Sequence, residues 1–187
     1  MAVMRRGSNV PLTQENPTLT SVVLGIRFSA GAEKLLIDNL VVAAILCDSS
    51  AKAISDEHFV FFNQLTTPDL SVSQLAEVVG EDQEQIEVDL TMVPSEVSRI
   101  VFVLYLNEGM LTHRSLGQLR EVVIRVLNLS DNRELVRSEN LADGLTAETA
   151  IALGELYRRA GEWKFKVIGD GYAKGIAGIA ADYGLTL

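Results

Sequence analysis

The sequence predicts a mainly β fold, a two-sheet β-sandwich with a few short helices that include one at the C-terminus. Six apolar segments rich in Val, Ile, Leu and Phe are separated by turn-forming residues, and a hairpin pattern follows them. Helical periodicity is scarce, so the long helices that a doubly wound α/β fold places between its strands are missing. Many short strands with few helices are typical of two packed sheets.

The strands are predicted from apolar content and alternation. Ile100–Leu106 is apolar throughout, which indicates a central strand covered on both faces. In Ile86–Leu90, apolar and acidic residues alternate, so we expect one buried and one solvated face. Turns are expected at 48–50 and 128–132. In chain order, the predicted strands are Ser21–Ser29, Leu40–Cys47, Phe59–Asn63, Gln85–Met92, Ile100–Leu106 and Glu121–Leu127.

A hairpin is predicted near the end of the chain. Ala150–Arg158 and Glu162–Ile168 flank the turn residues Ala160-Gly161. Within Trp163–Val167, aromatic and aliphatic side chains alternate with lysines, so the lysines are expected to face solvent. Thr149–Arg158 also fits a helix, and that alternative is left open.

One amphipathic helix is predicted. Gly171–Tyr183 places apolar and small residues on one stripe, and Gly184 follows as a C-terminal stop. Short helical turns are expected at Ser95–Ser98 and Arg114–Leu119. These elements are too short to form a helical layer of their own.

The composition indicates one folded domain over residues 1–187. Of the 187 residues, 48% are hydrophobic and 22% charged, and no linker or repeat divides them. The pI near 4.7 argues against binding to nucleic acid or to an anionic membrane, since both need clustered Lys and Arg. The absence of a signal pattern, the short apolar runs and the single cysteine predict a cytoplasmic protein without membrane insertion.

The negative charge is concentrated in one window. Ala53–Ser98 has ten acidic residues and no Lys or Arg, and the rest of the chain has 15 acids and 16 bases. Clustered carboxylates indicate either a hard cation such as Ca²⁺, which takes about six to eight oxygen ligands, or a solvated acidic surface. Charge alone favours the surface. The densest acids are Glu77, Glu81, Asp82, Glu84, Glu87 and Asp89.

A series of motifs in fixed order is similar to a known family over residues 5–187. The motifs are Arg6–Thr13, Asp56–Asn63, Ile86–Leu90, Val93-Pro94, Ile100–Val103, Gly154–Arg158, Gly161–Phe165, Gly171-Tyr172 and Gly175–Ala177. The chain thereby resembles the TerD family of tellurium-resistance and general stress proteins. That resemblance implies a calcium-binding β-sandwich in cells that resist tellurite, other chemical stress or phage, with no established enzymatic reaction.

The chain departs from the first of the family's two metal-binding segments. The family pattern is Asp-Phe-Asp-Leu-Asp-Ala-Ser, and the corresponding residues here are Ile37–Ala43. Asn39 and Val41 stand where the family has aspartates, and Asp38 is one place out of register.

The second segment is a loop that ends Gly-Asp-Asp-Glu in the family. Here it is Gln74–Glu84, which is shorter, has Gly80 as its one glycine, and keeps acids at matched positions only in Asp82 and Glu84. Because calcium affinity depends on how many charged oxygens converge, we expect calcium binding to be weak or absent. The residues left to hold an ion are Asn39, Glu81, Asp82 and Glu84.

Other candidate chemistry has simpler explanations. Gly169–Gly175 is similar to a dinucleotide-binding loop, but its spacing is one residue too long and too little chain follows for a βαβ unit. His58 is expected at the surface, His113 in a loop, and Cys47 as a small buried hydrophobe. Asn107-Glu108 stands where the family has His-Asp. The sequence reveals no Ser-His-Asp or Cys-His grouping.

We therefore predict a non-enzymatic stress-response protein of the TerD type with a reduced or lost calcium site. Its expected partners are other tellurium-resistance or stress-complex proteins. Two alternatives stay open: a metal-independent adaptor that acts through protein contacts, and a module that binds a small ligand between the sheets or a cyclic nucleotide. The sequence carries no signal for the oligomeric state.

Overall fold

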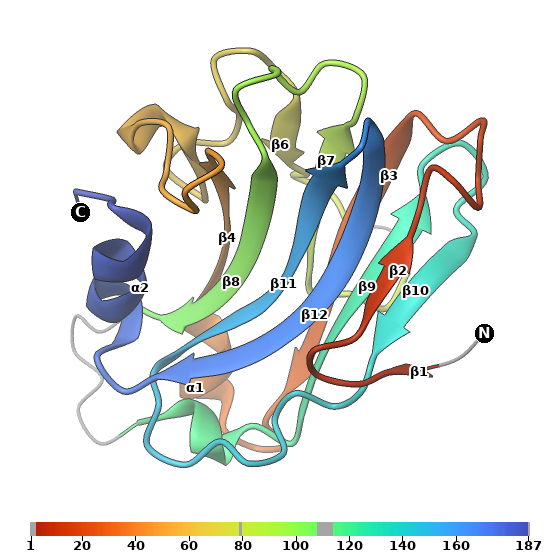
Figure 1. The fold of residues 1–187 in the computed structure, drawn as a ribbon. Helices are drawn as coiled ribbons and strands as arrows, with labels where there is room; N and C mark the ends of the chain where they lie inside the picture. The colour runs from red at the N-terminus through yellow and green to blue at the C-terminus, as the bar shows by residue number, and fades with distance from the viewer. Residues whose placement is uncertain (1–2, 79, 108–113, 187) are drawn as a thin grey trace.

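Two six-stranded sheets pack face to face in the computed structural model, which describes residues 3–78, 80–107 and 114–186 (Figure 1). The neighbouring strands pair antiparallel except β1 and β10, which are parallel. The order in sheet A is β1 (Val3–Met4), β10 (Glu134–Ser138), β9 (Glu121–Asn128), β3 (Ser21–Ser29), β7 (Glu84–Asp89) and β6 (Val72–Gln74). The order in sheet B is β2 (Asn9–Pro11), β12 (Glu162–Tyr172), β11 (Ala150–Arg159), β8 (Arg99–Leu106), β4 (Leu40–Cys47) and β5 (Phe59–Val60).

The main core lies between the sheets. It is built from alternate residues of the central strands, because successive side chains of a strand point to opposite faces. Those from β3, β8 and β9 are fully buried: Val22, Leu24, Ile26, Ile100, Phe102, Leu104, Val122, Ile124 and Val126. The predicted β-sandwich is therefore confirmed.

A second apolar cluster covers the outer face of sheet B. Three alternate residues of β8, Val101, Val103 and Tyr105, belong to it. Helix α2 (Gly175–Tyr183) packs there through Ile179 and Ala180 (Figure 1). The prediction that the 100–106 strand is covered on both faces is confirmed.

Several predicted boundaries are confirmed and others are wrong. β3 and β4 begin and end where predicted, and β11 and β12 form the hairpin, which excludes the helical alternative. The helix begins at Gly175 rather than Gly171, because β12 stays paired with β11 as far as Tyr172. Gly184 ends it in the left-handed conformation, as predicted.

Two strands are shorter at their C-terminal ends than the apolar pattern predicts. β7 ends at Asp89, whose Oδ1 accepts hydrogen bonds from the backbone and hydroxyl of Thr91 and so turns the chain. β5 ends at Val60, and Phe61 and Gln64 form a tight turn through reciprocal backbone hydrogen bonds.

The elements that the sequence did not predict are short. They are β1, β2, β6 and β10, the helix α1 (Lys34–Asp38) and the 3-10 turn η1 (Asp56–His58). A second 3-10 turn, η2 (Leu116–Gln118), lies within the expected turn at 114–119. Pro11 fits β2 because that strand lies at a sheet edge. No helix among the described residues is long and apolar enough to cross a bilayer.

Truncation of Phe102 tests whether the inter-sheet core carries the stability. Phe102→Ala removes a fully buried ring and is expected to lower the free energy of unfolding by about 3–5 kcal/mol. Urea denaturation monitored by circular dichroism measures this. Phe62→Ala, at a half-exposed ring, is the matched control and is expected to change stability by less than about 1 kcal/mol. Equal losses in the two variants would contradict this assignment of the core.

Candidate functional site

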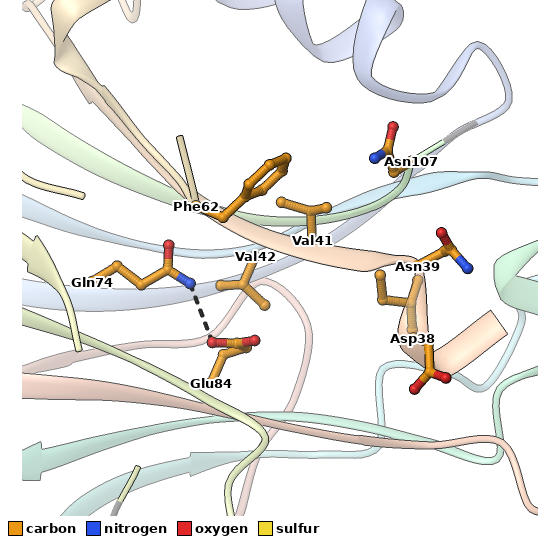
Figure 2. A pocket seen from close by; sticks show the side chains of 9 residues that line it. Asp38, Asn39, Val41, Val42, Phe62, Gln74, Glu84 and Asn107 are labelled. Atoms are coloured by element: carbon orange, nitrogen blue, oxygen red, sulfur yellow. Dashed lines mark hydrogen bonds between the residues drawn. The ribbon is translucent and has the colours of Figure 1, made fainter. Parts of the chain in front are cut away.

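A cavity of about 300 Å³ opens between the two sheets. Its walls come from the end of α1, the start of β4, the turn after β5, the end of β6, the start of β7 and the residue after β8. Figure 2 shows the side chains that line it: Asp38, Asn39, Leu40, Val41, Val42, Phe62, Gln74, Glu84 and Asn107. Two of the four predicted metal ligands, Asn39 and Glu84, thus share one cavity.

Asn39 is positioned by the end of α1. Its backbone N–H donates to Leu36 O at 3.1 Å, and its side-chain Nδ2 donates to Leu35 O at 2.8 Å. The backbone N–H of Asn107 in turn donates to Asn39 O at 2.9 Å. The amide nitrogen of Asn39 is therefore used by the helix end, and its Oδ1 is the atom that can accept from a ligand.

Glu84 pairs with Gln74 across the neighbouring strands β7 and β6. Gln74 Nε2 donates to Glu84 Oε2 at 3.1 Å (Figure 2). The other amide atom, Gln74 Oε1, is buried and has no hydrogen-bond donor. Since a carboxylate accepts only, Glu84 orients this amide, and the cavity gains a second acceptor beside the carboxylate.

The polar groups of the cavity lie in two separate places. Figure 2 shows Gln74 and Glu84 on one side and Asp38, Asn39 and Asn107 on the other, with Val41 and Val42 between the two groups. Calcium requires about six to eight oxygens at roughly 2.3–2.6 Å from a single point. Among the residues that the structure describes, no three His, Cys, Asp or Glu side chains gather in a way that could hold a metal. The donor set does not fit a tight calcium site.

Asp82 faces an arginine on the outer face of sheet A. Arg125 donates from Nε to Oδ1 at 3.0 Å and from Nη2 to Oδ2 at 2.7 Å, and Gln85 Nε2 donates to Oδ2 at 2.9 Å. The Asp82 side chain is 0% exposed and that of Arg125 12%. A methyl group at Gly25 would come within 2.1 Å of Asp82 Oδ2, so the carboxylate reaches its partners only because residue 25 is glycine. Asp82 is not among the residues that line the cavity.

The ion pair continues into β10. Arg125 Nη1 donates to Glu134 Oε1 at 3.0 Å, and Arg137 Nη2 donates to the same oxygen at 2.8 Å. Burial acts to raise the pKa of Glu134, but the hydrogen bonds from Arg137 and Arg125 outweigh it and the pKa is lowered. The hydrogen bond to Asp82 raises the pKa of Arg125. Asp82, Arg125 and Glu134 therefore form a charged network in which each ion has a partner.

The fourth predicted ligand, Glu81, is at the surface and pairs with Arg27 at 3.1 Å. The four predicted residues are thus divided among the cavity, the Asp82–Arg125 pair and the solvent, and their role as metal ligands stays a prediction.

Sequence reasoning missed Gln74, Phe62 and Arg125. A lone arginine in the otherwise apolar run 122–127 was the available signal, because a half-buried cation in a strand needs a carboxylate partner.

The structure brings together a serine, a histidine and an aspartate that the sequence did not reveal as a group. Ser55 Oγ lies 2.7 Å from His58 Nδ1, and His58 Nε2 lies 3.9 Å from Asp69 Oδ2. At 3.9 Å the carboxylate does not hold the imidazole, and Ser55 Oγ also accepts the Glu57 N–H as the cap of η1. This arrangement is a local cap. His58, expected at the surface, is partly buried, with its side chain 13% exposed.

The remaining candidates have structural explanations where they are described. Cys47 is fully buried, as predicted, and burial raises the pKa of its thiol to about 12, so no reactive thiolate forms near neutral pH. Gly169 and Gly171 lie inside β12 rather than in a phosphate-binding turn. Glu108 and His113 lie outside the described residues.

Comparison with known proteins places these observations in a family. The TerD domain family matches residues 1–183. The chain is 36% identical to the tellurium resistance protein TerD of Serratia marcescens, over 98% of this chain and 97% of that protein. It is 37% identical to general stress protein 16U of Bacillus subtilis (strain 168), with the same coverage.

Two solved structures share the fold. A homologue of the telluride resistance protein TerD from Streptomyces coelicolor A3(2) superposes with a TM-score of 0.65 at 16% identity, over 87% of this chain and 95% of that chain. A protein of unknown function superposes with a TM-score of 0.67 at 18% identity, over 90% and 99%. At these identities the match supports the fold alone.

The Asp82–Arg125 pair is expected to be essential for stability. Arg125→Met leaves a buried, unpaired carboxylate and is expected to cost about 3–5 kcal/mol of unfolding free energy. The double variant Arg125→Met/Asp82→Asn is expected to lose less than the sum of the two single losses, because it removes both charges. Urea denaturation measures all three variants, and Arg133→Met, at an exposed arginine, is the control. Additive losses would contradict the pairing.

Because of Glu134, the stability of the folded protein is expected to depend on pH. Because its pKa is lowered in the folded state, its contribution is present above the ordinary glutamate pKa of about 4.3 and is lost as the pH falls through the lower folded value. Between about pH 6 and pH 3, the wild type should lose more stability than Glu134→Gln in urea titrations. Glu121→Gln, the same change on the adjacent strand, should behave as the wild type does. Parallel pH profiles for the wild type and Glu134→Gln would contradict this.

Proposed function

Since the chain belongs to the TerD family, we propose that it is a non-enzymatic, cytoplasmic stress-response protein of the tellurium-resistance type whose calcium site is reduced. The observation that carries this proposal is the bidentate hydrogen bonding of Asp82 to Arg125. Asp82 keeps acidic character at a position matched to the family's metal-binding loop, yet its carboxylate is already neutralised by a cation of the protein itself.

Further contacts of the same segment support a site that does not depend on an ion. Gln83 Oε1 accepts the Phe28 N–H at 2.7 Å, and the Gln83 N–H donates to Ile26 O at 3.0 Å. Together with the Asp82 ion pair, these bonds attach residues 82–83 to β3 and β9. A metal ion that used Asp82 would first have to displace Arg125 and Gln85 from it.

The chemistry of the described nucleophiles supports a non-enzymatic role. The thiol of Cys47 is buried and its pKa is raised. Ser55 is a helix cap, and the carboxylate of Asp69 is too far from His58 to orient a general base. A free, buried cysteine also fits the reducing conditions of the cytoplasm.

A metal-independent adaptor is the second candidate, and one surface feature favours it. Phe62, Leu65 and Leu70, all between β5 and β6, are at least half exposed. Large exposed apolar side chains close together in sequence are typical of protein contact surfaces. Other tellurium-resistance or stress-complex proteins are the partners we propose for this segment.

Calcium-dependent melting tests the proposal. A dissociation constant above about 1 mM gives less than about 0.4 kcal/mol of stabilisation at 1 mM calcium, and we expect Tm to rise by no more than about 1–2 °C. A dissociation constant of about 1 µM would instead give about 4 kcal/mol and a rise of roughly 8–16 °C. A rise of that size, absent with magnesium at the same concentration, would overturn the proposal.

Restoring a carboxylate provides the matched gain-of-function variant. Val41 lies between the two polar groups of the cavity, where the family pattern has an aspartate (Figure 2). Val41→Asp is expected to increase the calcium-dependent rise in Tm above that of the wild type, because it adds a charged donor at the centre. Isothermal titration calorimetry measures the gain in affinity directly. Val41→Asn, which adds no charge, is the control.

A further inference from the structure

The cavity between the sheets has the chemistry of a binding site for an organic cation. None of its described lining residues is Lys or Arg, whereas Asp38 and Glu84 contribute carboxylates and three amides contribute acceptor oxygens. The formal net charge of −9 adds a long-range attraction for cations. The inference rests on the proposed function in one respect, that calcium does not already hold this cavity.

One end of the cavity is suited to a group with several N–H donors. Glu84 accepts one hydrogen bond from Gln74, and Gln74 Oε1 is buried without a donor. A buried acceptor without a partner is unfavourable, so a donor-rich group beside Glu84 would satisfy both side chains. An ammonium offers three such donors and a guanidinium five.

The opposite end offers a second place for positive charge. Asp38 and the Oδ1 of Asn39 lie there, with Asn107 nearby (Figure 2). Asp38 forms an ion pair with Lys34 at 3.8 Å, but both side chains are exposed, so the pair is weak and a ligand can compete with it.

The surface between the two ends is apolar. Val41 and Val42 lie between the polar groups, and the half-exposed ring of Phe62 lies over them (Figure 2). Valine side chains cannot coordinate an inorganic ion, but they pack well against methylene groups. The face of an aromatic ring also attracts an organic cation.

From this arrangement we propose that the cavity binds a short aliphatic diamine, a molecule with a cationic group at each end of a methylene chain. One cationic group contacts Glu84 and Gln74, the chain lies along Val41 beneath Phe62, and the second group contacts Asp38 and Asn39. The same chemistry is present in a lysine or arginine side chain of a partner protein, which would supply one cationic end only.

Titration with defined amines tests the proposal. Isothermal titration calorimetry with 1,4-diaminobutane and 1,5-diaminopentane is expected to give binding at low ionic strength that weakens as salt is added. Butylamine is expected to bind about tenfold more weakly, because it satisfies one end only, and 1,4-butanediol not measurably. In ¹⁵N spectra, the side-chain amide signals of Asn39, Gln74 and Asn107 should shift together with the diamine. Equal affinity for butylamine and the diamines would favour the partner side chain and overturn the diamine assignment.

A matched pair of variants on one strand locates the site. Glu84→Gln removes the carboxylate from the cavity and is expected to weaken diamine binding about tenfold. Glu87→Gln makes the same change on the opposite face of β7 and is expected to alter affinity less than about twofold. Circular dichroism and urea denaturation confirm that both variants are folded. Equal losses of affinity in the two variants would show that the acidic surface in general attracts the diamine and would overturn the proposal.

Adding calcium to the diamine titration distinguishes this proposal from that of the reduced calcium site. If micromolar calcium displaced the diamine, the reduced calcium site would be wrong, and the diamine would be a competitor at a metal site rather than the ligand for which the cavity is suited. If neither diamine nor calcium bound, the diamine proposal alone would fail. Binding of the diamine that millimolar calcium does not displace is the result we expect.

Discussion

The buried ion pair between Asp82 and Arg125 is the interaction on which the geometry of the site depends. It joins the segment before β7 to the centre of sheet A, and it is possible only because Gly25, which pairs with both Gln85 and Arg125, leaves space for the carboxylate. Glu84 follows Asp82 by two residues, so the position of the ion pair also determines where the first side chain of β7 enters the cavity. An unpaired charge at either position would be costly, so the two residues stabilise one loop conformation.

This pairing bears on the expected calcium chemistry. In a loop of clustered carboxylates, mutual repulsion is relieved by water, by a hard cation or by basic side chains. Here Arg125 neutralises Asp82, Arg27 pairs with Glu81, and Glu84 shares its charge with the amide of Gln74. The acids that the resemblance assigns to one ion therefore have three different local partners. Under the proposal of a reduced calcium site, the conformation of residues 81–84 would therefore depend on these protein partners rather than on the calcium concentration.

Sequence periodicity was sufficient to predict the long central strands but not the short strands at the sheet edges. β3, β4 and β8 carry eight or nine residues each, long enough for an apolar pattern to be read. β1, β2 and β6 have two or three residues and exist because neighbouring strands offer hydrogen bonds, which no local pattern encodes. Asn39 and Glu84 could be brought together through the family resemblance. The Asp82–Arg125 pair could not, because its members are 43 residues apart and meet only through the registers of β3 with β9 and of β3 with β7.

A valine at position 41, where the family resemblance implies an aspartate, connects the two proposals about the cavity. Calcium must exchange most of its hydration shell for protein oxygens, and a valine at the centre supplies none, so the ion would lose water without compensation. A diamine needs no convergent donors: its cationic groups keep part of their hydration at the two open ends, and each buried methylene contributes about 0.8 kcal/mol. On the two proposals together, the residue that weakens an inorganic site is also the one that provides an apolar surface for an organic cation. The separation of the polar groups by Val41 and Val42, and not the number of acidic residues, is what distinguishes the two ligands.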